Sequence, residues 1–207
     1  KYIGRSRANA VIVAVCALLT YGGVSLFVVV FAVYPFAAEL YRQSNIPKRL
    51  MPGALALGAF SFTMDSLPGT PQIQNIIPTT FFETTSWAAP ILGTIGSIFM
   101  IVVGLGYLEW RRRAAMAAGE GYGTTLVNEP DRVENTSLPN PLLALLPLIV
   151  VGVANFVLTK MIPEWYGASF TVAPDILPGL KAPITTPIKT VVAIWAVQGA
   201  LLLGILF

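Results

Sequence analysis

Most of this 207-residue chain lies in apolar runs that are long enough to enter a lipid bilayer. The runs cover residues 8–42, 91–108, 141–162 and 190–207. Hydrophobic residues make up 55% of the chain and charged residues only 11%, whereas a soluble domain carries about 25% charged residues. Such a chain cannot cover itself with a solvated surface. The sequence therefore predicts an all-α integral membrane protein with several membrane-spanning helices.

The remaining composition argues against several classes of function. Basic residues stand at the ends of the apolar runs and form no stripe, which argues against nucleic acid as a partner despite the net charge of +3. Cys16 is the single cysteine, so no intrachain disulfide can form, and the absence of histidine argues against a typical zinc site. The sequence contains no nucleophile–base pair and no Walker-type glycine loop. We therefore expect neither an enzyme nor ATP-driven transport, and no cofactor.

The first apolar run, residues 8–42, has an awkward length. As one helix, its 35 residues would reach about 52 Å, against a hydrocarbon core of about 30 Å. Gly22-Gly23 and Pro35 are the natural break points. The run predicts either one long kinked span or a span followed by a broken one. Because these alternatives put its two ends on different sides, the orientation in the membrane stays open.

Residues 46–77 contain two short arms around a proline- and glycine-rich tip. The apolar arm "MPGALALGAFSF" leads into "TMDSLPGT", and "PQIQNII" follows. Neither arm has the roughly 20 residues needed to cross a bilayer. We therefore predict a re-entrant hairpin. Its two ends, near Arg49 and Thr79, are then expected on one side of the membrane.

The rest of the chain alternates between spans and aqueous connections. We expect a broken span over 81–110, with Trp110 and Arg111–Arg113 as its interfacial anchor. The expected order after it is an aqueous loop (111–140), a span (141–162), a second aqueous loop (163–189) and a span cut short (190–207). We interpret the whole chain as part of a single membrane transport domain of a longer protein.

The polar tip has the properties of a ligand site. Broken helices at membrane depth are tolerated only inside protein or along a water-filled cavity, and they are the best sequence pointer to a transporter binding site. Thr70 can cap a helix that starts at Pro71, and the free N–H groups of Gln72 and Ile73 would then face the tip. Together with the helix dipole, these groups would suit a carboxylate.

Further polar residues complete the predicted substrate site. Gly69 allows close approach of the backbone, and Ser66, Gln72 and Asn75 supply neutral hydrogen-bonding groups. A second helix start with hydroxyl caps is predicted at Thr84, Thr85 and Ser86. The alternative interpretation is an extracellular loop that carries the same residues, but it does not explain the short apolar arm before the tip.

Asp65 and Glu83 are the candidates for coupling transport to protons. They are the only acids between Glu39 and Glu109, and ionisable residues at membrane depth are functional by default. Desolvation would raise the pKa of either carboxyl group and suit it to proton uptake and release. The alternatives are that either acid lies solvated at an interface, or that hydroxyls at Ser66 and Thr70 bind a coupling sodium ion.

The pattern "LPGTPQIQNIIPTTFFETTSWAAPILG", followed by "GYLEWRRR" and "AGEGYG", resembles the gluconate permease family of organic-anion symporters, within the ion transporter superfamily. The resemblance covers residues 22–123. It implies a carrier of two inverted repeats, each with a re-entrant hairpin and a broken helix. It also implies proton-driven uptake of sugar acids or other hydroxy-carboxylates across a bacterial inner membrane. The chain departs from the family in lacking histidine and in carrying Glu83 where relatives commonly have glycine.

These observations together predict a multi-pass secondary transporter for a small organic anion. The site residues that match the family's hairpin tip and break are Ser66–Pro71, Gln72, Asn75 and Thr84–Ser86. Expected partners are the anion, a proton or sodium ion and the lipid bilayer, with a homodimer as an open alternative. A non-transporting membrane subunit, whose hairpin only packs against a partner, is the alternative function.

Overall fold

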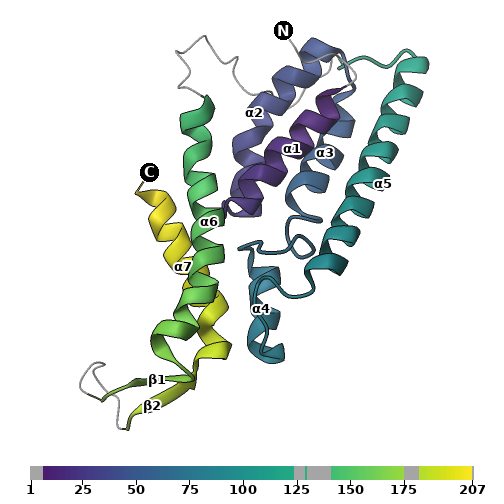
Figure 1. Ribbon diagram of the computed structural model, residues 1–207. Helices are drawn as coiled ribbons and strands as arrows, with labels where there is room; N and C mark the ends of the chain where they lie inside the picture. Colours follow the sequence, from purple (N-terminus) through teal and green to yellow (C-terminus); the bar gives the residue numbers. More distant parts are fainter. Residues whose placement is uncertain (1–6, 124–128, 130–140, 175–181, 207) are drawn as a thin grey trace.

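The computed structural model describes residues 7–123, 129, 141–174 and 182–206 (Figure 1). These residues form helices almost throughout, with one small pair of strands. Three of the described helices are long and apolar enough to cross a membrane, namely Leu26–Ser44, Pro90–Ala117 and Ile188–Ile205. The predicted all-α class of membrane protein is therefore confirmed.

Helices α1 (Ala8–Tyr21) and α2 (Leu26–Ser44) form an antiparallel hairpin. The chain turns at residues 22–25, here called the hairpin tip, where Gly23 has a φ of +91°. Between the two arms, the buried Tyr41 hydroxyl donates a hydrogen bond to the Asn9 side chain. With 14 residues, α1 reaches only about 21 Å, which is less than the thickness of a bilayer core. The chain breaks at Gly22-Gly23, one of the two predicted break points, and continues as helix through Pro35, so residues 8–42 form two antiparallel helices and not one long kinked span.

Helices α3 (Met51–Ala59) and α4 (Ile73–Phe82) follow one another along the molecule instead of lying side by side (Figure 1). A short 3₁₀ turn, η2 (Lys48–Leu50), precedes α3, and residues 60–72, here called the break, separate α3 from α4. The hairpin predicted for 46–77 is therefore wrong, and this segment is a broken helix.

Each half of the broken helix has a packing partner of its own, which explains why the halves do not fold onto each other. Helix α3 packs on α1 so closely that a Cβ on Gly58 would lie 2.5 Å from the Cβ of Cys16. Helix α4 instead packs against the last helix, with Ile76 buried beside Ala193 and Val197. Two short arms around a tip thus describe a broken helix as well as they describe a hairpin.

Helix α5 (Pro90–Ala117) starts beside the break, where Gly93 packs against the Ser66 carbonyl, and returns the chain to the end from which α3 starts (Figure 1). It begins after the loop of residues 83–89, with Ala89 as its N-cap residue. The broken span predicted for 81–110 is therefore the end of α4, a loop and one continuous helix. Of the loop predicted for 111–140, residues 111–117 are helical, and residues 124–128 and 130–140 lie outside the described residues.

The C-terminal region is a second, simpler unit. Helix α6 (Pro141–Tyr166) leads into strands β1 (Ser169–Val172) and β2 (Ile184–Pro187), and α7 (Ile188–Ile205) follows directly. The strands pair antiparallel, with Ser169 opposite Pro187. The spans predicted for 141–162 and 190–207 therefore correspond to α6 and α7. The loop predicted for 163–189 contains the end of α6 and this strand pair.

The two units have separate apolar cores. The larger core lies among α1, α2, α3 and α5 and is centred on buried residues such as Ile12, Val29 and Ala54. A smaller one joins α6 and α7 around Ile162 and Val192. We refer below to α1–α5 as the body and to α6–α7 as the helix pair.

Candidate functional site

The hairpin tip and the break meet inside the protein, and Gln72 joins them. The side-chain amide of Gln72 donates hydrogen bonds to the carbonyl oxygens of Thr20 (2.8 Å) and Val24 (3.1 Å). Pro71 lies beside Gly23, where an added Cβ would be 3.6 Å from the proline ring. Gln72 is only 6% exposed, so the junction of the two chain breaks is a packed part of the structure.

Two helix N-termini point their free N–H groups toward this junction. Helix α2 starts after Ser25, and α4 starts after Gln72, whose backbone is extended. The first intrahelical bonds of α4 come from Asn75 and Ile76 to the Gln72 carbonyl, which leaves the N–H groups of the preceding turn without a backbone partner in the described chain. Helix dipoles add positive partial charge at both starts. The N–H ends of α2 and α4 thus lie at the junction together with the carbonyl end of α1, whose Thr20 carbonyl accepts from Gln72.

The predicted capping role of Thr70 is wrong. Thr70 is fully buried, and its hydroxyl donates to the Thr63 carbonyl (2.5 Å), back across the break. Thr63 in turn donates to the Gly58 carbonyl (2.7 Å). These bonds satisfy carbonyl groups of the unwound chain and of the last turn of α3. The helix therefore begins at Ile73, and Thr70 stabilises the break itself.

Gly69 is the most constrained residue of the break. Its φ is +80°, and an added Cβ would lie 2.4 Å from the Trp87 ring. Its N–H donates to the Ser86 carbonyl (2.9 Å), and the neighbouring Pro68 carbonyl accepts a hydrogen bond from the Tyr21 hydroxyl (3.0 Å). A glycine is required here both by the backbone conformation and by the indole ring.

The predicted second helix start at Thr84, Thr85 and Ser86 is a loop that folds back onto the break. Asn75 ties the two together, because its side-chain amide donates to the carbonyls of Thr70 and Ser86, each at 2.9 Å. Ser86 is buried, whereas Thr84 and Thr85 are half-buried, and the Thr85 hydroxyl accepts from the Trp87 N–H (3.3 Å). The hydroxyls thus cap no helix, since α5 starts only at Pro90.

Both candidate coupling acids are exposed, so the desolvation expected for them is not found, but they have different partners. Asp65 is an exposed residue of the break and accepts a hydrogen bond from the Ser66 hydroxyl (3.0 Å), while Gly93 of α5 packs against the Ser66 carbonyl. Glu83 ends α4 with a φ of +50° and forms an ion pair with Lys189 of α7. A glycine would adopt that φ without strain. The structure does not bring the two acids together, and no cluster of metal-ligating side chains occurs in its described part.

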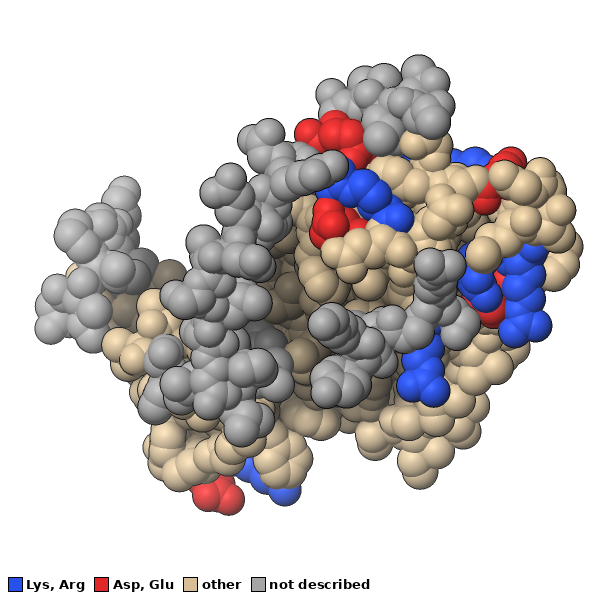
Figure 2. All heavy atoms as spheres, turned by 90° about the horizontal axis from the view of Figure 1, so that it is seen from above, with Lys and Arg blue, Asp and Glu red and all other residues tan. Residues whose placement is uncertain are grey.

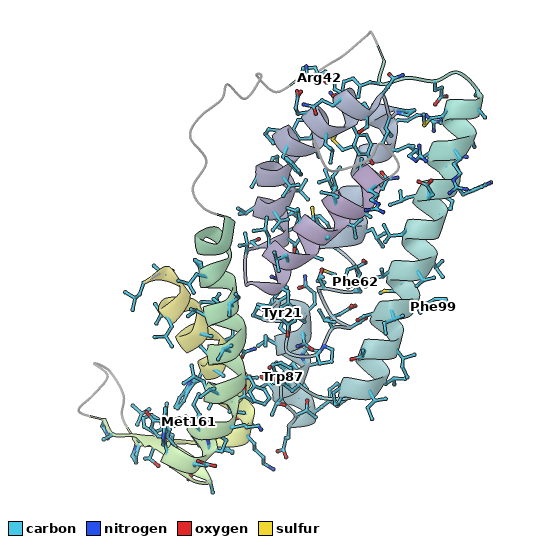
Figure 3. All side chains as sticks on the ribbon, turned by 45° about the horizontal axis from the view of Figure 1, so that its top comes forward. Tyr21, Arg42, Phe62, Trp87, Phe99 and Met161 are labelled. Carbon is cyan, nitrogen blue, oxygen red and sulfur yellow. The ribbon has the colours of Figure 1, made fainter. Side chains whose placement is uncertain are left out.

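Three residues near the break were missed by sequence reasoning, namely Tyr21, Trp87 and Asn155. Tyr21 and Trp87 lie on the side of the break that faces α6 (Figure 3). They line, with Phe156 and other α6 residues, an open apolar cleft of about 590 Å³. Asn155 donates from its side-chain amide to the Gly69 carbonyl (2.9 Å). The signal for Asn155 was present, because it is a lone amide within an apolar run.

A comparison with curated proteins gives one informative match. The chain is 49% identical over 214 residues to a protein of Bacillus subtilis (strain 168) named an uncharacterized transporter, YxjC. The chain is similar to a transporter. The match includes all of this chain but only 45% of the relative's length. It supports membrane transport by a multi-pass protein, while the gluconate permease family and the substrate stay predictions.

The other two comparisons give no match. No protein-family model matches the chain, and no solved structure matches it. The geometry of the two breaks therefore carries the functional argument beyond transport in general.

Proposed function

We propose that this chain is part of a secondary active transporter that binds a small organic anion where the hairpin tip meets the break. The observation that carries the proposal is the convergence of the starts of α2 and α4 on a junction closed by Gln72. Interrupted helices that aim their N-termini at one point are a recurrent anion site of carriers. The transporter would lie in the lipid bilayer of the cytoplasmic (inner) membrane of a bacterium.

The chemistry around the junction favours a carboxylate with hydroxyl groups. Except for Lys160, whose amine lies over the Phe156 ring within α6, the described lysines and arginines lie near the ends of the helices, so the ligand's charge would be balanced mainly by N–H groups and helix dipoles. Ser66 on the open side of the break and the free N–H groups at the start of α4 offer neutral donors and acceptors. A sugar acid or other hydroxy-carboxylate fits such a site.

Asp65 is our candidate for coupling the anion to a proton. It is an exposed acid within the break, so it can exchange a proton when the site is open. Binding an anion nearby would favour its protonated form, because like charges disfavour ionisation, and proton and anion would then bind cooperatively. Glu83 is the weaker candidate because Lys189 already neutralises it.

The distribution of charge suggests which end of the molecule faces the cytoplasm. Figure 2 shows lysine, arginine and acidic side chains gathered over one end. Seven basic residues flank the helix ends there, namely Arg7, Arg42, Lys48, Arg49, Arg111, Arg112 and Arg113. Only Lys160 and Lys189 lie in the opposite half of the described chain. By the positive-inside rule, the end with Arg42 and Arg49 is cytoplasmic.

The proposal is tested with the complete protein in proteoliposomes. Uptake of radiolabelled gluconate, lactate and acetate is measured with a proton gradient, a sodium gradient or neither. We expect gradient-driven accumulation of at least one hydroxy-carboxylate, with Asp65→Asn retaining exchange but losing proton-driven accumulation. Glu83→Gln, a matched neutralised acid, should keep both. Uptake of no carboxylate under any gradient would reject the proposed function.

A further inference from the structure

Helix α6 places a single polar side chain against the break. Asn155 is 1% exposed and stands in the apolar sequence "IVVGVANFVL". Polar groups within membrane helices are costly and face protein or water rather than lipid. Asn155 therefore has a local role that its helix alone does not explain.

The contact made by Asn155 is with the backbone of Gly69. Its amide nitrogen donates to the Gly69 carbonyl at 2.9 Å, while the Gly69 N–H donates to the Ser86 carbonyl at 2.9 Å. Both hydrogen-bonding groups of this glycine are thus held, one by α6 and one by the 83–89 loop. The neighbouring Phe156 meets the Trp87 ring edge to face, with ring centres 5.2 Å apart. Two consecutive residues of α6 therefore contact the break and the indole that covers it.

The other half of the Asn155 amide shows that this contact has a cost. Its carbonyl oxygen is buried without a hydrogen-bond partner in the described chain, as are the Ser86 hydroxyl and the Trp87 indole N–H. An unsatisfied buried polar group is destabilising, so an apolar side chain at this position would be cheaper for packing alone. What an apolar side chain cannot supply is the donor to Gly69.

We propose that Asn155 is a positioning residue of the substrate site, which fixes the break from outside the body. Gly69 lies three residues before Gln72, the N-cap residue of α4. Holding its carbonyl sets the direction of the chain through Thr70 and Pro71 and, with it, the aim of the N–H groups at the helix start. The helix pair then takes part in ligand affinity without touching the ligand. This inference rests on the proposed anion site.

The test compares Asn155→Leu with Thr159→Val in the complete protein. Thr159 is the matched control because it is buried one turn further along α6, and its hydroxyl bonds within the helix, to the Asn155 carbonyl (2.7 Å). We expect Asn155→Leu to raise the KM for gluconate, or for whichever carboxylate the wild type transports, by about tenfold. That corresponds to about 1.4 kcal/mol, the scale of one hydrogen bond. Vmax and the melting temperature should stay close to those of Thr159→Val.

Several outcomes would overturn the positioning role. A KM for Asn155→Leu within twofold of that for Thr159→Val would do so, as would a fall in melting temperature with no change in KM. If Asn155→Leu does not fold, Asn155→Gln, which keeps an amide donor, is measured in its place. Failure of both variants to fold would make Asn155 purely structural. A wild type that transports no carboxylate would instead reject the proposed function itself.

Discussion

The body and the helix pair are built on opposite principles. In the body, helices stop in mid-molecule at the hairpin tip and at the break, and side chains such as Gln72, Thr70 and Asn75 satisfy the backbone groups that are left. In the helix pair, α6 and α7 run 26 and 18 residues without interruption, despite Pro147 and Pro163 within α6.

The two units meet through apolar packing and a few polar bonds. Beyond an apolar patch where Ile76 meets α7, these contacts include the bond from Asn155 to Gly69 and the ion pair of Lys189 with Glu83. Irregular backbone at membrane depth must have its polar groups paired by other parts of the protein or by water, whereas a regular helix pairs its own. We therefore propose that the body supplies the ligand chemistry and that the helix pair frames it.

The largest effect is expected for a methyl group at the break. Gly69→Ala forces a side chain into a left-handed conformation and against the Trp87 ring, 2.4 Å from the new Cβ. Together these cost roughly 2–5 kcal/mol, and transport should be lost. In the helix pair, Gly152→Ala meets no atom within 4 Å and should be neutral or slightly stabilising. Uptake and melting temperature are measured for both variants. Equal values for Gly69→Ala and Gly152→Ala would contradict the proposed difference between the body and the helix pair.

A smaller effect is expected when the bridge between the two breaks is removed. Gln72→Leu removes the side-chain donor to the Val24 carbonyl and one of two donors to the Thr20 carbonyl, which keeps the Gly23 N–H, and should destabilise the body by roughly 1–3 kcal/mol. Gln198→Leu is the control in the pair, because Gln198 is exposed on α7. Thermal unfolding in detergent measures both. Equal melting temperatures for the two variants would show that Gln72 does not hold the tip to the break.

The charged end of the body should respond to acid more than the pair does. The hydrogen bond from Lys48 (2.5 Å) holds the pKa of Glu129 below its ordinary value of 4.5, and Tyr122 donates a second bond. A lowered folded-state pKa contributes stability that is complete above pH 4.5 and is lost as the pH falls through the folded-state pKa. Melting temperatures between pH 3 and pH 6 should show this loss. Glu129→Gln should remove that acid step, whereas Glu164→Gln in α6 should retain it.

The smallest effect is expected for the ion pair that connects the two units. The side chains of Lys189 and Glu83 are 60% and 52% exposed, so their pairing is worth at most about 0.5 kcal/mol. In a double-mutant cycle, Lys189→Ala and Glu83→Gln should change uptake less than twofold and show little coupling energy. A coupling energy as large as that lost in Asn155→Leu would show that the ion pair at the end of α4, and not the bond at the break, is the main connection between the two units.

The sequence predicted the apolar segments well and their connections poorly. Apolar runs and basic ends are local signals, and the spans at 141–162 and 190–207 match α6 and α7. Whether a chain folds back or continues after a tip depends on what packs beside each arm. The hairpin was therefore expected at 46–77 and is found at α1–α2, while 46–77 is the broken helix. We accordingly expect cysteines at Arg49 and Thr80 to label from opposite faces.

The grouping of the candidate site residues was predicted in part, while their role as a ligand site stays a prediction. Gly69, Thr70, Gln72, Asn75 and Ser86 do lie together, because the polar stretch is local and its halves fold onto one another. What each side chain does there could not be foreseen, since Gln72 bonds to carbonyls some 50 residues earlier in the chain. Asn155 lies 86 residues after Gly69 in the chain, and only the folded structure brings the two residues into contact.

The Gln72 bridge also sets the order in which the protein can be assembled during synthesis. Helix α1 is too short to enter a bilayer as a span, and within the tip the Thr20 carbonyl accepts only from the Gly23 N–H until Gln72, the donor to Thr20 and Val24, has left the ribosome. The N-terminal hairpin must therefore wait, in the translocon or at the membrane surface, for a segment made about 50 residues later. At the bacterial synthesis rate of roughly 5–20 residues per second, this interval lasts several seconds. During that time the first two helices depend on the insertion machinery to shield their unpaired backbone.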